Sequence, residues 1–272
     1  DGRIEQVAAM KFPHASGYDV DRKGEKYVFY RDYQGAPPLK LMTVDEGRVV
    51  LNKELDFPTP IRELAFSPDG ERVATLDEKR EVRLLDLSSE ESVVVDQLAG
   101  GERGVAFSPD GKLLAVSREP EAGEYEVRFW DVSQTPPRHV QRLNFRSKRV
   151  MENLQFSPDG KLLAFFGNNS VGIVDVSGEE PREVFSSGAQ NSFGQYAAFS
   201  PDGKMVALSV GKSPRLEIRD TRDFELLKKW DLPMPVSLKF APDSRHLFLG
   251  NTNGTVYVLR LPYSPGSPAE GE

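Results

Sequence analysis

The sequence predicts an all-β fold assembled from repeats of one four-stranded unit. The first observation is a recurring string, Phe-Ser-Pro-Asp-Gly, whose last residue falls at Gly70, Gly111, Gly160 and Gly203. A variant string, FAPDS, places Ser244 at the same position, and a weaker copy of the motif places Gly24 there. Neighbouring copies therefore lie 41 to 49 residues apart. Because a period in the low forties with strand-like segments is the length of one propeller blade, we expect a β-propeller.

The second observation is that each unit has the same internal order. An alternating segment such as 61–66 enters the turn, and a short apolar segment such as 72–76 leaves it. A third segment such as 82–87 and a more polar fourth such as 92–98 follow. These period-2 segments bounded by turn residues predict strands, and no convincing helical stretch of useful length is found.

The count of units predicts six four-stranded antiparallel blades. The last unit stops after its third strand, residues 255–261, so its fourth strand must come from elsewhere. Residues 2–13 match residues 47–58 in phase, with Gly-Arg at the start and Phe-Pro at the end. We therefore expect residues 2–10 to pair in the last blade and close the ring. The alternative is a seven-bladed ring with one blade missing from this fragment.

The domain organisation follows from the same count. Residues 1–262 are predicted to form a single propeller domain. Residues 263–272, which are rich in Pro, Gly and Ser, read as a disordered tail or linker. The chain begins with Asp1 rather than Met, so we interpret it as part of a larger protein.

Composition restricts the partners. The chain of 272 residues carries a formal net charge of −7 and has a pI near 5.3. Nucleic acid is therefore not an expected partner, because binding to phosphates needs clustered Lys and Arg. No apolar run approaches the roughly 18 residues that cross a bilayer, so no membrane association is expected. The absence of Cys excludes disulfides and thiolate ligands but does not settle the compartment; the cytoplasm is slightly favoured over export.

The repeat is similar to a known family. The FSPDG turn, the apolar strand after it and the string VRFWDV at 127–132 resemble the WD40-repeat family of β-propellers. Only this unit keeps the Trp-Asp pair, at Trp130 and Asp131, and the Gly-His of that family is missing. The resemblance implies a binding scaffold. Because the family's hydrogen-bonded tetrad is incomplete in every unit, apolar packing should hold the blades together.

The Asp and His residues, which could take part in catalysis or bind a metal, are expected to have structural roles instead. The Asp of each turn, for example Asp69, is expected to bond backbone N–H groups within the turn, and the Asp that ends each third strand is expected to cap the next turn. The three histidines, His14, His139 and His246, lack the spacing of a metal site. No nucleotide loop or nucleophile elbow occurs. The sequence thus predicts no catalytic residue, no metal and no cofactor.

The candidate binding face is the set of loops at the channel mouth. Polar residues there can bind a protein or a peptide, including an acidic one, because Arg offers a fork of donors to carboxylates. The candidate residues are Arg62, Arg103, Lys148, Arg149, Glu152 and Gln195. The acidic loop 118–126 and the basic loop 145–149 flank the same blade and are expected to neutralise each other in part.

The predicted function is therefore a non-catalytic scaffold that binds a protein or peptide as a monomeric accessory domain. The alternative is a propeller enzyme, or the propeller that gates substrate access in a hydrolase, since strings of the SPDGK type also occur in propellers of that kind. The third strands, VRFWD and VRLLD, favour the first interpretation.

Overall fold

A computed structural model of the chain describes most of the predicted strands. The described residues are 17–20, 26–30, 39–45, 48–55, 57, 59–98, 101–121, 124–146, 153–167, 170–178, 181–187, 196–210, 215–232, 235–251 and 256–261. They group into two compact units. Unit 1 comprises residues 1–116 and 129–141, and unit 2 comprises residues 117–128 and 142–272.

Unit 1 holds two complete antiparallel sheets. The first has the order β1-β2-β3-β4, with strands Gly17–Val20, Lys26–Tyr30, Leu39–Asp45 and Arg48–Leu55. The second has the order β5-β6-β7-β8, with strands Ile61–Phe66, Arg72–Asp77, Glu81–Asp86 and Ser92–Gln97. A further sheet, whose residues are divided between the units, has the order β12-β11-β10-β9. Its strands in chain order, β9 to β12, are Gly101–Phe107, Leu113–Glu121, Glu124–Asp131 and Arg138–Arg146.

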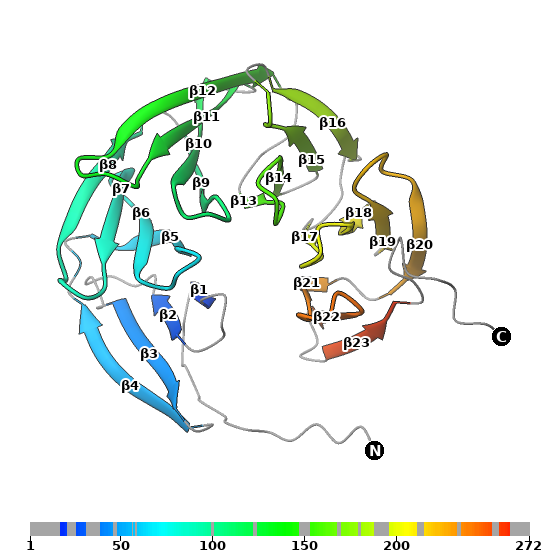
Figure 1. Ribbon diagram of the computed structural model, residues 1–272, viewed down its shortest axis with the longest axis horizontal. Helices are drawn as coiled ribbons and strands as arrows, with labels where there is room; N and C mark the ends of the chain where they lie inside the picture. Colours follow the sequence, from blue (N-terminus) through cyan, green and yellow to red (C-terminus); the bar gives the residue numbers. More distant parts are fainter. Residues whose placement is uncertain are drawn as a thin grey trace. The chain divides into compact units, whose positions relative to one another are not determined.

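Unit 2 holds the remaining sheets (Figure 1). One has the order β13-β14-β15-β16, with strands Asn153–Phe156, Leu162–Gly167, Ser170–Asp175 and Arg182–Ser187. The next has the order β17-β18-β19-β20, with strands Ala197–Phe199, Met205–Val210, Arg215–Asp220 and Leu226–Asp231. The last has three strands among the described residues, β21-β22-β23, at Pro235–Phe240, His246–Asn251 and Val256–Arg260.

The fold is an all-β, six-bladed β-propeller, which confirms the predicted fold class. Every sheet pairs its strands in chain order, as consecutive hairpins require, and the described residues contain no helix. None of them, accordingly, forms a helix that could span a membrane. The expected pairing of residues 2–10 in the last blade lies outside the described residues. The single domain over 1–262 and the tail 263–272 remain predictions.

The repeated turn has the geometry that its sequence predicts. Gly111 has a φ of 70°, a left-handed value that a glycine adopts without strain. The Ser108 hydroxyl donates to the Asp110 carboxylate at 2.6 Å and accepts the amide of Leu113 at 2.9 Å. The same carboxylate accepts the amide of Lys112 at 3.1 Å. The repeated Asp therefore closes the turn, as predicted, and its hydrogen bonds recur at Asp69, Asp159 and Asp202.

The last copy keeps the turn with different residues. Ser244 replaces the glycine and has a φ of 57°. Asp243 accepts the amides of Arg245 and His246, and its second carboxylate oxygen lies 2.6 Å from His246 Nδ1. His246 therefore contacts a residue of its own turn.

Side chains at the turns link neighbouring blades within each unit. In unit 1, Lys26 Nζ donates to the Gly70 carbonyl at 2.8 Å, and Arg72 donates to the Gly111 carbonyl at 2.9 Å. In unit 2, the Asp202 amide donates to the Ser244 hydroxyl at 3.1 Å. The inner strands carry a second link, because the Phe66 amide on β5 donates to Asp19 on β1 at 2.8 Å. These contacts fix the spacing between sheets and so shape the spaces between blades.

Candidate functional site

The predicted binding residues are only partly placed. Arg62 is the second residue of β5, and its guanidinium lies 3.0 Å from Glu78 Oε1. Arg103 lies on β9, but its side chain is outside the described part of the chain. The other four, Lys148, Arg149, Glu152 and Gln195, lie outside the described residues altogether. The structure therefore does not test whether the six residues form one face.

Arg62 is suited to a binding test because its ion pair is exposed. The side chains of Arg62 and Glu78 are 48% and 39% accessible. Exposed pairs contribute about 0–1 kcal/mol, so we expect Arg62→Ala to change the free energy of unfolding by less than about 1 kcal/mol. Urea denaturation of the two proteins checks this. A larger loss would show that Arg62 supports the fold and is no neutral probe of binding.

One acidic residue of the segment 118–126, Glu126, has its partners within its own sheet, whereas the expected neutralisation by the loop 145–149 lies outside the described side chains. Glu126 on β11 accepts hydrogen bonds from Arg118 on β10 and from Arg128 on its own strand, and lies 3.8 Å from Arg142 on β12. Its carboxylate is thus neutralised within the sheet. The basic residues Lys148 and Arg149 lie outside the described part of the chain.

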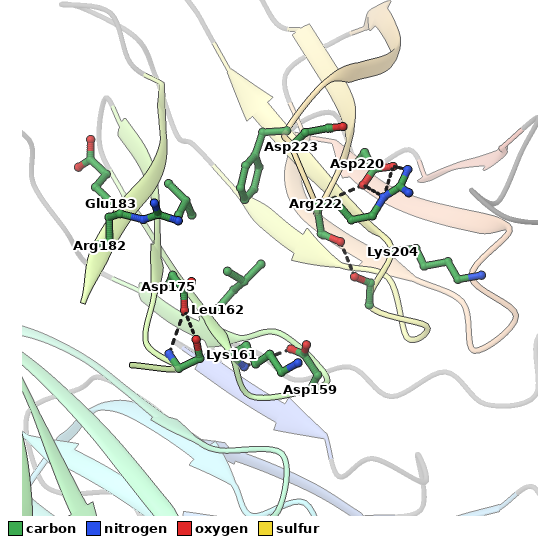
Figure 2. Close-up of a pocket in the computed structure, with 15 residues that line it drawn as sticks. Asp159, Lys161, Leu162, Asp175, Arg182, Glu183, Lys204, Asp220, Arg222 and Asp223 are labelled. Atoms are coloured by element: carbon green, nitrogen blue, oxygen red, sulfur yellow. Dashed lines mark hydrogen bonds and ion pairs between the residues drawn. The ribbon is translucent and has the colours of Figure 1, made fainter. Parts of the chain in front are cut away.

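The structure adds a pocket that the sequence did not predict. It has a volume of about 750 Å³ and lies in unit 2, between the sheet β13–β16 and the sheet β17–β20 (Figure 2). The repeated turns and the starts of the outer strands form its walls. Its lining includes the cationic residues Lys161, Arg182, Lys204 and Arg222, the acidic residues Asp159, Asp175, Glu183, Asp220 and Asp223, and the apolar residues Leu162, Val184 and Phe224.

The carboxylates of the pocket are occupied by their own turns. Asp175 accepts the amide of Ser177 at 2.9 Å and its hydroxyl at 2.6 Å. These bonds hold the pKa of Asp175 below its usual value, and the positive charges of Arg182 and Lys161 act in the same direction. Asp220 is bound by the Arg222 guanidinium, which likewise lowers the pKa of Asp220. These two groups therefore stay ionised at neutral pH.

Of the four cationic side chains that line the pocket, Arg222 is the one that forms an ion pair with a described acidic group. Within the described part of the chain, no ion pair joins Lys161, Arg182 or Lys204 to an acidic group. All three side chains are exposed. Figure 2 shows Arg182 turned toward the space between the two sheets and Glu183, its neighbour on β16, turned away, as the alternation along a strand requires. These three cations stand beside five lining carboxyl groups, so the pocket carries charges of both signs.

Apolar side chains complete the wall. Leu162 and Val184 are half-buried, and both pack against a cluster that contains Phe224. The Phe224 ring stacks on Phe185 at a centroid distance of 5.4 Å, although the φ of Phe224 is 59°. A bulky residue rarely adopts this left-handed backbone, so packing must hold it there. The apolar wall therefore belongs to a core cluster of this part of the chain.

The Asp residues that end the third strands cap the following turn, as predicted. Their hydrogen bonds lead us to expect that the protein loses stability in acid. The Ser88 hydroxyl and the Ser89 amide donate to Asp86 and, with the other bonds of this turn, lower its pKa from 3.8 to about 2. Because the folded pKa lies below the unfolded one, this stabilisation is present above about pH 4 and is lost as the pH falls toward 2. We expect the melting temperature to fall over that interval, and ¹³C NMR should show Asp86 titrating near pH 2. A melting temperature constant from pH 5 to pH 2 would contradict this.

The fold and the pocket define the class of protein, a six-bladed β-propeller with a charged pocket between two of its blades. No family model and no curated protein matches the sequence. Among solved structures, the chain is similar to Kuenenia stuttgartiensis hydrazine synthase, with a TM-score of 0.70 and 18% identity over 89% of this chain and 82% of that one. It is also similar to a putative 6-phosphogluconolactonase from Bacteroides uniformis, with a TM-score of 0.73 and 16% identity over 93% and 82% of the two chains. At these identities the likeness shows the fold alone.

The pocket was not predicted from the sequence, because the candidate binding residues were chosen at the ends of the strands that lie opposite the repeated turns. A signal was present in the residue after the turn glycine, which is lysine at Lys112, Lys161 and Lys204. Three of the six units carry this lysine, whereas Glu25, Glu71 and Arg245 occupy the corresponding position in the others. The significance of this lysine depends on the spacing between two sheets, which the sequence does not state.

Proposed function

We propose that this propeller is a non-catalytic module that binds a protein or peptide. The observation that carries the proposal is the pocket between the β13–β16 and β17–β20 sheets, which combines charged side chains of both signs with an apolar wall. Such a surface recognises a ligand by charge and by packing. The resemblance of the repeat to WD40-repeat propellers, whose members are binding scaffolds, supports the same function.

The state of the titratable groups favours binding over acid–base chemistry. A general acid needs a pKa near the working pH, which enzymes reach by raising the pKa of a carboxyl group. Asp175 and Asp220 instead have lowered pKa values. The two described histidines are also engaged, His246 with Asp243 and His139 edge-on to Trp130 at 5.4 Å. These contacts support a binding function over acid–base chemistry.

A peptide library displayed on phage tests the proposal. Wild-type protein should enrich a recurring peptide motif, and the purified peptide should bind in fluorescence anisotropy. The protein should be inert toward ester, peptide and glycoside substrates. Turnover of any such substrate that is lost on changing a residue of the propeller would establish the alternative, a propeller enzyme, and would remove the proposal.

The same ligand locates the face. The triple variant Arg62→Ala, Arg103→Ala, Arg149→Ala probes the loops that the sequence predicts, and it should melt like the wild type. Loss of peptide binding in this variant places the ligand on the loop face. Binding that survives there and is lost on changing pocket residues places the ligand in the pocket.

A further inference from the structure

We propose that the outer edge of β23 is a docking site for a strand, and that its occupant is residues 3–10 of this chain in one defined register. The sequence predicts that this segment pairs in the last blade, and the registers of the described sheets assign which residues meet. Residues 3–10 themselves lie outside the described residues. The site is separate from the pocket and does not depend on the proposed binding function.

The outer edge of β23 is apolar. Among the described residues β23 pairs with β22 alone, and Val256, Val258 and the cross-strand partner of Val258, Phe248, are exposed. The outer strands of the complete sheets all carry charges, as Lys228 illustrates on β20, whereas β23 carries none before its last residue, Arg260. An uncharged, exposed edge strand is a template for another strand, and native proteins normally protect such edges. We therefore expect this edge to be covered.

The first sheet contains an inner strand, β3, that aligns with β23 and has a fourth strand beside it. Lys26 pairs with Thr43 on β3, and His246 pairs with Arg260 on β23. Lys26 and His246 both stand two residues after the last position of the repeated turn motif. Thr43 and Arg260 are therefore equivalent, and the preceding residues of the two strands align one by one.

Burial differs sharply between the aligned strands. Leu39 is fully buried, whereas Val256, at the equivalent position of β23, is 63% exposed. Leu39 pairs with Leu55 on β4, and both belong to one core cluster with Phe57, which follows β4. Residues of β5 complete that cluster. A fourth strand and the residues after it thus account for part of the burial that β23 lacks.

The pairing of β3 with β4 supplies the register. Thr43 pairs with Val50, and Leu39 pairs with Leu55. A β-bulge at Asn52 lies between these two pairs. The register on β23 follows if the N-terminal segment repeats the phase of β4.

The N-terminal segment does repeat that phase. Residues 2–13 match residues 47–58, with Glu5, Val7 and Met10 at the places of Val50, Asn52 and Leu55. The transferred register therefore sets Glu5 opposite Arg260, Ala8 opposite Val258 and Met10 opposite Val256.

Charge and packing both favour this occupant. Opposite charges on directly facing residues stabilise a strand pair, and the register gives Glu5 and Arg260 this relation. Residues 6–10 carry no charge, and neither do residues 256–259, which they face. Phe12 has the place of Phe57, a buried member of the cluster around Leu39. We therefore expect Phe12 to cover part of the exposed face of β23.

Disulfide trapping in the full chain tests the register, because the chain contains no cysteine of its own. The double variant Ala8→Cys, Val258→Cys should form a disulfide within one chain under mild oxidation, since directly opposed residues of paired strands meet the geometry of a disulfide. The matched variant Ala9→Cys, Val258→Cys moves the first thiol to the other face of the segment, so its cross-link should form at least about tenfold more slowly. Gel mobility without reductant and mass spectrometry of the linked peptides measure both rates.

A protease measurement tests the same contact without cysteines. Arg260→Glu places like charges opposite each other and should raise the rate at which thermolysin cleaves within residues 3–10 at least about threefold. The exchanged variant Glu5→Arg, Arg260→Glu should return that rate to within about twofold of the wild type. This measurement decides the matter if the cysteine variants do not melt like the wild type.

Three results would overturn the proposal. A disulfide that joins two chains makes a second copy the occupant of β23. Equal cross-linking rates for the two cysteine pairs contradict the register. The absence of any cross-link in a protein that melts like the wild type, or cleavage that the charge exchange does not restore, shows that residues 3–10 do not cover β23.

Discussion

Replacing Gly172 by alanine is expected to lower the free energy of unfolding by about 3 kcal/mol. A Cβ added at Gly172 on β15 would lie 2.0 Å from Cε2 and 2.2 Å from Cζ of Phe165, its partner on β14. No carbon pair approaches so closely, so the ring or the backbone must move. The ring is 4% accessible and packs with Tyr125 and Val174, which leaves it little room. Overpacking a filled core costs about 1–3 kcal/mol, and this overlap belongs at the upper end.

Thermal and urea denaturation measure this effect. A loss of about 3 kcal/mol corresponds to a melting temperature lower by roughly 6–12 °C for a domain of this size. The control is Phe165→Leu, which removes the two ring atoms that the new methyl group would meet. In that background Gly172→Ala should cost at least about 1 kcal/mol less, as expected for two residues in direct contact. Equal costs in both backgrounds would show that the ring is not the obstacle.

The pair of Phe165 and Gly172 also shows what the repeat encodes. Phe165 lies five residues after its turn glycine, as Thr75 does in the sheet β5–β8. Phe165 pairs with Gly172 across the strands, and Thr75 pairs with Arg83 in the same way. A large ring at this place requires a residue without a side chain opposite it. Comparison of the repeats within the sequence could therefore have predicted this contact.

Local chemistry explains which parts of the fold were predictable. The strand expected at 61–66 is β5, Ile61–Phe66, and the turn after it has the hydrogen bonds that Ser, Pro, Asp and Gly favour. These features depend on neighbours a few residues away. The hydrogen bond from Arg72 to the Gly111 carbonyl depends instead on how two sheets pack, so no local sequence pattern predicts it.

The candidate site was less predictable for the same reason. The predicted loop face rests on strand order alone, and of its residues only Arg62 has a described side chain. The pocket lies between two sheets and therefore depends on how they pack. Its lysines are visible in the sequence, but whether acidic groups lie within reach of them depends on the packed structure.

Replacing Glu126 by glutamine is expected to destabilise the protein by about 3 kcal/mol. The side chain of Glu126 is 5% accessible and serves Arg118 and Arg128, whose side chains are 13% and 21% accessible. Burial would raise the pKa of Glu126, but the hydrogen bonds and charges of the two arginines outweigh it and hold the pKa below its usual value. The folded state therefore depends on the negative charge. Removing one member of a buried ionic cluster costs about 3–5 kcal/mol, because the charges that remain lose their compensation. Glutamine keeps the shape of glutamate and part of its hydrogen bonding, so we expect the cost of this substitution at the lower end of that range.

The second blade provides a matched control for this prediction. Glu81 stands five residues before Asp86, as Glu126 stands five residues before Asp131, and it pairs with Arg83 at 2.7 Å. Both side chains of that pair are 21% accessible, so water replaces more of the lost interaction. Glu81→Gln should cost about 1 kcal/mol or less. Urea denaturation of the two variants at one ionic strength gives the comparison, and equal losses would contradict the role of burial.

A combined variant separates the net charge of the cluster from its packing. Arg118→Met, Glu126→Leu, Arg128→Met replaces all three charged groups by apolar side chains of similar length. A buried ionic cluster replaced as a whole is often no less stable, because its desolvation penalty is removed with its attraction. We therefore expect this triple variant to be more stable than Glu126→Leu alone, in which both arginines lose their shared carboxylate. If the triple variant is instead the less stable of the two, the arginines stabilise the sheet through packing of their stems more than through Glu126.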